Sequence, residues 1–362
     1  QIMNVGVPKE IKNNECRVGL TPDSVQELTN QGENVFVEKN AGIGVGFTDK
    51  MYEDYGGIIV DSAHEVFEQS ELIIKVKEPL LEEYKFLDES KTLFTYLHLA
   101  ADKENSKKLI NTGTTGIAYE TVTADDGTLP LLSPMSQIAG QISIVVGSYF
   151  LLKPNGGMGT LLTRVGDIRP RNVTVIGAGV AGKEAIKKAL SLGSFVRVID
   201  MSHEKLNKLK LELGAENIDY LVSSPEIIRE SISDADLVIG SVYVIGKEAP
   251  IVITEDMINA MKPGSVLVDI SIDQGGCVET SKPTTHDNPT FLYKDIVHYC
   301  VTNMPGAVPL TATLALNEAT LPYIKDLCRK GIEKALNDDN HLFNGLNLRD
   351  GKPIHPSLID SL

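Results

Sequence analysis

Residues 173–182 read VTVIGAGVAG, an apolar run that leads directly into three glycines spaced GxGxxG. The run predicts a buried strand, a tight turn and a helix, which is the setting in which this spacing binds a dinucleotide. Gly177 would permit the turn, Gly179 would let a pyrophosphate approach the backbone, and Gly182 would let helix and strand pack closely. The helix N-terminus would offer N–H groups to the phosphates. The alternative interpretation is a glycine-rich strand–helix turn without a ligand.

An aspartate follows these glycines at the spacing expected for a ribose contact. Asp200 comes 18 residues after Gly182, at the end of a second predicted strand. A carboxylate in this place accepts hydrogen bonds from the ribose hydroxyls, and it would repel the 2′-phosphate of NADP. The sequence therefore predicts NAD as the cofactor.

Short apolar, β-branched stretches alternate with helical patterns along the whole chain. This alternation predicts an α/β fold with two Rossmann-like, doubly wound domains built on parallel sheets. Strands are predicted at residues 35–37, 58–60, 72–76, 92–97, 116–119, 173–176, 195–199, 237–239, 266–270 and 297–301.

The length and two long helical stretches indicate how the domains follow one another. A chain of 362 residues exceeds one ordinary core, so two domains are expected. Helical stretches at about 133–152 and 311–330 flank the series of strands that contains the glycines. We therefore expect an NAD-binding domain at 133–306, inserted into a discontinuous substrate domain formed by 1–132 and 307–362.

The charge and the cysteines limit the partners and the compartment. The net charge of −15 disfavours nucleic acid and anionic membrane surfaces as partners, because both would repel the chain. The longest apolar run, at about 142–152, is too short to span a bilayer. The four cysteines lack CxxC spacing, which is typical of free thiols in a reducing compartment. We expect a cytoplasmic protein.

Seven segments spread over nearly the whole chain carry recognisable motifs: 7–18 (VPKEIKNNECRV), 75–79 (KVKEP), 95–100 (TYLHLA), 133–136 (SPMS), 273–277 (DQGGC), 284–286 (TTH) and 298–309 (HYCVTNMPGAVP). In this order they resemble the alanine dehydrogenase family, which also includes the alpha subunits of pyridine nucleotide transhydrogenases. Three departures from the family pattern stand out: Gln137 and Gln141 replace a usual glutamate and arginine, and residues 162–168 replace a glycine-rich run.

The resemblance implies two cationic residues that bind the substrate. Arg17 matches the family arginine that holds the substrate carboxylate, and a guanidinium pairs with a carboxylate through two parallel hydrogen bonds. Lys77 matches the lysine that contacts the carboxylate and carbonyl oxygens. Lys75 would point to the same face if the strand continued, so only the Lys-Glu-Pro match separates the two lysines. A surface arginine without a ligand is the alternative for Arg17.

The resemblance also implies two catalytic residues. His98 matches the acid/base histidine, and an imidazole titrates in the range that proton transfer needs. Asp273 matches the aspartate that faces the substrate across the nicotinamide, with Asp269 on the same strand as an alternative that only caps a loop. A structural histidine is the alternative for His98.

Further residues are implied as cofactor contacts. Asn303 and Met304 match the loop that returns to the nicotinamide, and Ser136 matches a contact to the cofactor phosphates or amide. No histidine spacing typical of a metal site occurs, so no metal is expected.

The implied activity is the reversible, NAD-dependent oxidative deamination of L-alanine to pyruvate and ammonium, in a homohexamer. Three alternatives stay open at this point. One is an opine-forming or saccharopine-type reductase, the second is an NAD(H)-binding subunit of a transhydrogenase, and the third is a dinucleotide sensor without catalysis.

Overall fold

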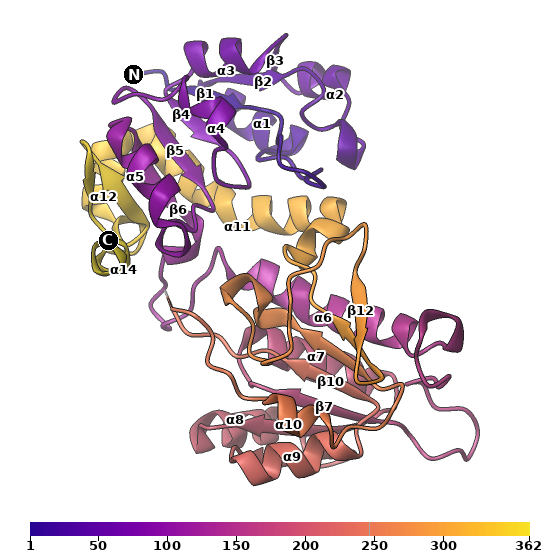
Figure 1. The fold of residues 1–362 in the computed structure, drawn as a ribbon. Helices are drawn as coiled ribbons and strands as arrows, with labels where there is room; N and C mark the ends of the chain where they lie inside the picture. The colour runs from indigo at the N-terminus through magenta and orange to yellow at the C-terminus, as the bar shows by residue number, and fades with distance from the viewer. Residues whose placement is uncertain (246) are drawn as a thin grey trace. The chain divides into compact units, whose positions relative to one another are not determined.

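The computed structural model describes residues 1–245 and 247–362, which form two units. Unit 1 comprises Gln1–Met135 and Val308–Leu362, and unit 2 comprises Ser136–Ala307. The chain leaves unit 1, builds all of unit 2 and then returns to unit 1, so both termini belong to unit 1 (Figure 1).

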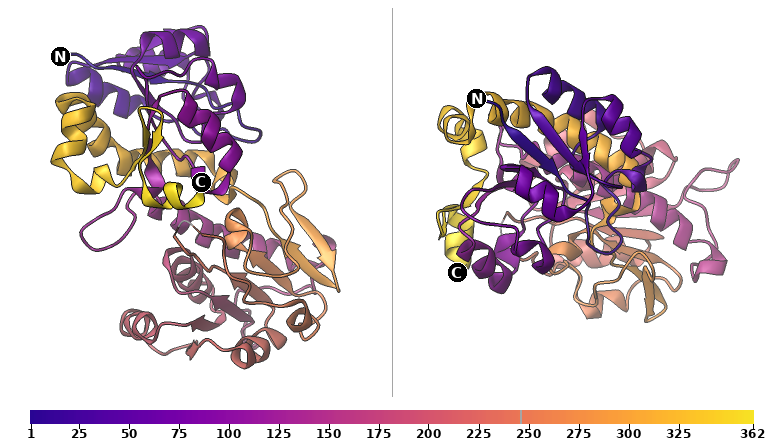
Figure 2. Two further views of the ribbon diagram at one scale, coloured as in Figure 1. Left: turned by 60° about the vertical axis from the view of Figure 1, so that its left-hand side comes forward. Right: turned by 90° about the horizontal axis from the view of Figure 1, so that it is seen from above.

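Unit 1 is an eight-stranded sheet whose six main strands are parallel. The order is β15-β14-β6-β5-β4-β1-β2-β3, so the chain starts in the middle, winds to one edge, returns and winds to the other edge. The parallel strands are β1 (Asn4–Val7), β2 (Asn34–Glu38), β3 (Ile58–Val60), β4 (Leu72–Ile74), β5 (Thr92–Thr95) and β6 (Thr115–Ala118). The antiparallel strands β14 (Leu346–Arg349) and β15 (Lys352–Pro353) extend the sheet beyond β6, where the yellow C-terminal segment lies beside the purple strands (Figures 1 and 2).

Helices cover this sheet, and polar caps begin several of them. Thr21, Thr48, Ser62 and Asp102 each accept a hydrogen bond from a backbone N–H in the first turn of the helix that follows. All three residues of β4 are fully buried, as expected for a central parallel strand covered on both faces. The helices of unit 1 are α1 (Pro22–Asn30), α2 (Asp49–Asp54), α3 (Ala63–Gln69), α4 (Leu81–Tyr84), α5 (Lys103–Asn111), α11 (Pro309–Lys330), α12 (Ile332–Asp338), α13 (Asn340–Phe343) and α14 (Pro356–Ser361).

Unit 2 repeats the same winding order in a seven-stranded sheet, β12-β13-β11-β10-β7-β8-β9. The parallel strands are β7 (Asn172–Ile176), β8 (Phe195–Asp200), β9 (Ile218–Val222), β10 (Leu237–Gly240), β11 (Val266–Asp269) and β13 (Ile296–Tyr299), and β12 (Thr290–Tyr293) is antiparallel. The helices are α7 (Val180–Ser191), α8 (His203–Leu213), α9 (Pro225–Ser233), α10 (Glu255–Ile258) and α6 (Ser133–Phe150), whose first turn belongs to unit 1.

The structure confirms the predicted fold class, with two doubly wound α/β units on mostly parallel sheets. Every predicted strand range overlaps an observed strand, and the two long helices appear as α6 and α11. Strands β1, β9, β12, β14 and β15 were not predicted from the sequence. In β1 the apolar pattern is interrupted by Gly6. A side chain at this position would collide with Ser70, because a Cβ on Gly6 would lie 2.6 Å from Ser70 Oγ. Within the described residues, no helix has the length and apolar character required to cross a bilayer.

Candidate active site

Three neighbouring strands in the middle of the unit 1 sheet carry the predicted substrate residues at one edge. Strands β1, β4 and β5 are adjacent and parallel, so their carboxyl ends meet there. Arg17 lies in the loop after β1, Lys77 follows β4 and His98 follows β5. The winding direction reverses between β1 and β4, and ligands of doubly wound sheets bind outside the strand ends at such a point.

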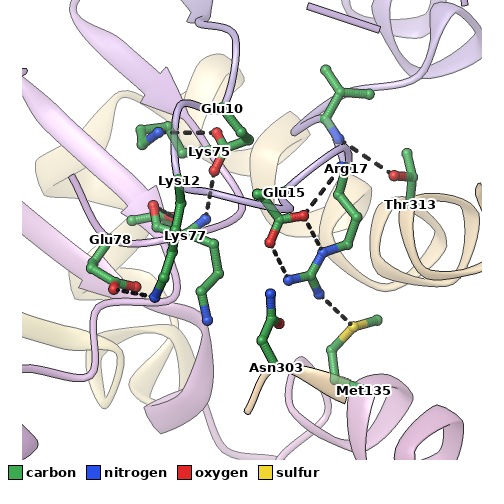
Figure 3. A network of polar contacts seen from close by, with 12 residues as sticks. Glu10, Lys12, Glu15, Arg17, Lys75, Lys77, Glu78, Met135, Asn303 and Thr313 are labelled. Carbon is green, nitrogen blue, oxygen red and sulfur yellow. Dashed lines mark hydrogen bonds and ion pairs between the residues drawn. The ribbon is translucent and has the colours of Figure 1, made fainter. Parts of the chain in front are cut away.

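Arg17 is held by a carboxylate two residues earlier in the same loop. Its side chain is buried, with Nε 2.7 Å from Glu15 Oε2 and Nη2 2.5 Å from Glu15 Oε1, and Nη1 contacts the sulfur of Met135 at 3.4 Å (Figure 3). Burial disfavours the charged guanidinium, but the hydrogen bonds and charge of Glu15 outweigh this effect and raise the pKa of Arg17. The predicted alternative of a surface arginine therefore does not describe Arg17.

The two candidate lysines have different environments. The ammonium of Lys75 is buried between two carboxylates, 3.0 Å from Glu10 Oε2 and 3.3 Å from Glu83 Oε2. Lys77 is only partly buried, and its backbone N–H donates to Glu10 Oε1 over 2.8 Å. In Figure 3 the side chains of Lys77 and Arg17 extend in the same direction from their loops. Because both carboxylates already neutralise Lys75, Lys77 is the better candidate for an anionic ligand.

His98 has an unusual backbone conformation and a carboxylate beside its ring. Its φ is +48°, in the left-handed region that non-glycine residues rarely adopt, and its side chain is 45% exposed. Glu120, just after β6, accepts hydrogen bonds from the backbone N–H groups of Leu97 and His98, and its Oε2 lies 3.8 Å from Nδ1 of the imidazole. Glu120 thus holds the backbone and lies beside Nδ1 of the ring, and Nε2 lies on the far side of the ring.

The glycine-rich loop of unit 2 has the geometry that a bound pyrophosphate requires. Gly177 has a φ of +103°, and a Cβ there would lie 2.3 Å from the Ser241 carbonyl oxygen. A Cβ on Gly182 would lie 1.8 Å from the Gly177 carbonyl oxygen, whereas a Cβ on Gly179 would meet nothing within 4 Å. Gly179 is also the N-cap of α7, and no side chain caps that helix. The loop is therefore packed against backbone at Gly177 and Gly182 and open at Gly179, so the residues present fit a dinucleotide.

This contrast predicts different effects for the same substitution at two of the glycines. Gly179→Ala should weaken NADH binding roughly tenfold or more and leave the melting temperature nearly unchanged, because its backbone is extended and the added methyl projects into open space. Gly182→Ala should destabilise unit 2 by about 1–3 kcal/mol, because the methyl meets backbone. NADH fluorescence titration and thermal denaturation measure the two effects. Unchanged NADH affinity in Gly179→Ala would show that no phosphate passes over this residue.

Asp200 ends β8 beside this loop. One carboxylate oxygen accepts the Ala178 N–H at 2.8 Å and the other accepts the Ser202 N–H at 2.8 Å. The carboxylate is thereby fixed next to the second residue of the glycine motif. A carboxylate oxygen has more than one lone pair, so these bonds leave Asp200 able to accept from a ribose hydroxyl as well.

The remaining predicted residues of unit 2 lie on two loops that are joined by hydrogen bonds. Asp273, in the 3₁₀ turn after β11, accepts the backbone N–H of Asn303 at 3.1 Å, and His286 Nε2 lies 2.9 Å from the Asn303 carbonyl oxygen. Met304 is buried. Asp269 is fully buried and accepts hydrogen bonds from Ser271, Cys277, Val278 and Ser281, so it caps the loop.

The departures from the family pattern lie on α6 and the loop that follows it. Gln141 Nε2 is 3.5 Å from Glu184 Oε1, which joins α6 to α7. Ser136 and Gln137 lie in the first turns of α6, where Ser136 is partly buried and Gln137 is exposed. Among the described residues, no group of three or more His, Cys, Asp or Glu side chains is arranged to hold a metal ion.

The carboxylates that hold the predicted residues were not predicted from the sequence. Glu120 directly follows a predicted strand next to the strand that precedes His98, so its place at a strand end was a usable signal. Glu15 precedes Arg17 by two residues, but nothing in the sequence shows that their side chains meet. No local signal indicates Glu10, because its partners come 65 and 67 residues later in the chain.

The doubly wound units and their loops define a two-domain α/β oxidoreductase with a dinucleotide-binding domain. The family model for the N-terminal domain of alanine dehydrogenase/PNT matches residues 6–139, and the model for the C-terminal domain matches residues 143–356. The chain belongs to the alanine dehydrogenase/PNT family.

Individual relatives agree with this assignment. The chain is 49% identical over 350 residues to an alanine dehydrogenase of Halomonas elongata, covering 97% of this chain and 94% of that protein. A solved structure of L-alanine dehydrogenase superposes with a TM-score of 0.94 at 46% identity, covering 99% of both chains. A transhydrogenase of Sinorhizobium meliloti has a TM-score of 0.81 at 24% identity and covers 98% of this chain and 99% of that one, which shows a shared fold only. The predicted family and enzyme class are confirmed.

Proposed function

We propose that the protein catalyses the reversible, NAD-dependent oxidative deamination of L-alanine to pyruvate and ammonium. The observation that carries the proposal is the placement of Arg17, Lys77 and His98 at the carboxyl ends of three adjacent strands of unit 1. Oxidising an α-amino acid needs a cation for its carboxylate, a donor for its carbonyl oxygen and a base, and these three residues supply one group each. Relatives named alanine dehydrogenase at 46–49% identity support the same reaction.

Arg17 and Lys77 would bind the substrate. The guanidinium fork matches a carboxylate in geometry and stays charged at every relevant pH. Lys77 would donate to the carboxylate and to the carbonyl oxygen of pyruvate, which polarises the carbonyl carbon for attack by ammonia. Together the two cations offset the acidic character of the chain at the point where an anion must bind.

His98 would move the protons. Nδ1 faces Glu120, so Nε2 is the atom that would take a proton from the attacking water or the amine during deamination and return it during amination. Glu120 would stabilise the ring orientation and the positive charge that develops on the imidazole. Bound NAD would supply the redox chemistry by accepting the hydride from the substrate Cα. Asp273, whose carboxylate also orders the Asn303 backbone, would hold the loop that faces the nicotinamide, with Asn303 and Met304 on it and Ser136 as a further contact.

The compartment and the assembly follow the family. All four cysteines are free thiols, three of them buried, which supports a cytoplasmic location. A homohexamer is proposed from the resemblance. Exposed apolar side chains on α6 and in the segment after it fit burial in such an assembly: Val145, Tyr149, Leu152, Leu161, Val165 and Ile168.

The proposed function is tested by measuring NADH and NADPH formation with a panel of L-amino acids. We expect L-alanine to give the highest kcat/KM and NAD to be strongly preferred over NADP. Asp200→Ala should narrow that preference, because the carboxylate that would repel a 2′-phosphate is removed. Failure of every amino acid to be oxidised would refute the proposal. Equal turnover with both cofactors in the unmutated protein would refute the role of Asp200.

A further inference from the structure

A buried group of three charges contacts the backbone of Lys77. Glu10, Lys75 and Glu83 are at most 5% exposed, and the Lys75 ammonium lies between the two carboxylates. Burying charges costs free energy, and the loss of water raises the pKa of Glu10 even though Lys75 opposes this. Apolar residues would fill the same volume without this cost, so stability alone is a weak reason for the group to be there.

Glu10 and Glu83 make the same kinds of contact and differ only in which backbone N–H group each carboxylate accepts from. Each pairs with Lys75 through one oxygen, and each accepts a single backbone N–H through the other oxygen. Glu83 accepts from Leu80, at the start of α4, over 3.0 Å. Glu10 accepts from Lys77 over 2.8 Å. Only Glu10 therefore reaches the residue proposed to bind the substrate.

The backbone of Lys77 is anchored on both sides. Its N–H donates to Glu10, and its carbonyl oxygen accepts the hydroxyl of Thr95 at 2.9 Å. Two residues before Lys77, the carbonyl oxygen of Lys75 accepts a hydrogen bond from the hydroxyl of Tyr119 at 2.9 Å. Thr95 ends the neighbouring strand β5 and Tyr119 directly follows β6, whereas Glu10 comes from the loop after β1. Glu10 therefore links the backbone of Lys77 itself to the loop that also carries Arg17. A second link joins the same segments, because the Lys12 ammonium lies 2.9 Å from Glu78 Oε1 (Figure 3).

We propose that Glu10 is a positioning residue that sets the place of the Lys77 ammonium relative to Arg17, and that Lys75 serves as its internal counter-ion. The proposal rests on the proposed function of Lys77 in substrate binding. Lys75 would keep Glu10 charged and hold its carboxylate in one orientation, so that the other oxygen always faces the Lys77 N–H. The similar sequence positions of the two lysines thus hide different roles, one binding the substrate and the other holding the residue that positions it.

The test compares Glu10→Gln with Glu83→Gln. Each variant neutralises one of the two carboxylates that pair with Lys75 and keeps the size of the side chain. We expect Glu10→Gln to raise the KM for pyruvate roughly tenfold and to lower kcat severalfold, because Lys77 is proposed both to bind pyruvate and to polarise its carbonyl group. The KM for NADH should change little, because Lys77 is not among the proposed cofactor contacts. Both variants should lower the melting temperature by similar amounts, because each removes one partner of Lys75. Glu83→Gln should leave the KM for pyruvate unchanged. Equal KM values in the two variants would overturn the proposal.

A double-mutant cycle shows whether the effect passes through Lys77. In a Lys77→Ala background, Glu10→Gln should raise the KM for pyruvate no further, whereas full additivity would overturn the proposal. If Glu10→Gln does not fold, Glu10→Asp keeps the charge but is too short to reach both partners, and it should raise the same KM severalfold. Absence of any pyruvate turnover in the unmutated protein would refute the proposed function itself, which is a different result from an active enzyme that does not respond to Glu10.

Discussion

Replacing His98 with asparagine is expected to lower kcat by a factor on the order of 10²–10⁴ while the protein stays folded. Asparagine is the appropriate substitution because it tolerates the left-handed backbone conformation of this residue, at φ +48°, better than alanine does. It also occupies part of the space of the ring but cannot exchange a proton near neutral pH. Loss of activity then reports the proton transfer and not a collapse of the loop.

Several measurements separate catalysis from structure in this variant. NADH affinity should be nearly unchanged, since the proposed cofactor contacts all lie in unit 2, and the melting temperature should change by only a few degrees. The pH profile of kcat/KM should lose one limb. His64→Ala serves as the control, because His64 is an exposed histidine on α3 whose ring pairs with Glu68, one turn later in the same helix. A stable and fully active His98→Asn protein would rule out His98 as the acid/base.

Replacing Arg17 with lysine is expected to raise the KM for pyruvate about 10- to 100-fold. Nε and Nη2 of Arg17 each donate one hydrogen bond to Glu15, and Nη1 contacts the Met135 sulfur. A substrate carboxylate would therefore approach the end of the guanidinium formed by Nη1 and Nη2 and would replace the weak contact with the sulfur. A lysine ammonium keeps the charge but cannot bind Glu15 and present two parallel donors to a second carboxylate. Loss of one hydrogen bond to a charged group corresponds to about 1.5–3 kcal/mol.

The same substitution will also affect stability, so its effect on binding needs a control. Arg17 and Glu15 are both buried, and a lysine would leave Glu15 with fewer hydrogen bonds. Arg197→Lys is the control for the loss of an arginine–carboxylate pair, because Arg197, on β8 in unit 2, pairs with Asp234 in a more exposed position than Arg17 and Glu15. We expect both variants to lose stability and only Arg17→Lys to lose pyruvate affinity at unchanged NADH affinity. An unchanged KM for pyruvate would show that Arg17 does not hold the carboxylate.

The strands and glycines were predictable because their signals are local. Central parallel strands such as β4 are apolar along their whole length, since both faces are buried, and this pattern is visible in any short window of sequence. The roles of Gly177 and Gly182 also follow from a local motif, and the structure shows the tight contacts that the motif implies. Edge strands such as β15, only two residues long, carry too few residues to form a pattern.

The sequence by itself determined the fold class, the family and the residue types of the candidate site. Only the tertiary structure decided which groups surround those residues. Lys75 and Lys77 differ by two positions and look equivalent in sequence, yet one is buried between two carboxylates and the other is partly exposed. The physical reason is that Glu10 and Glu83 reach Lys75 from opposite directions along the chain, and Glu120 reaches His98 from the next strand. Such pairings depend on strand order and loop paths, which no local pattern of residues encodes.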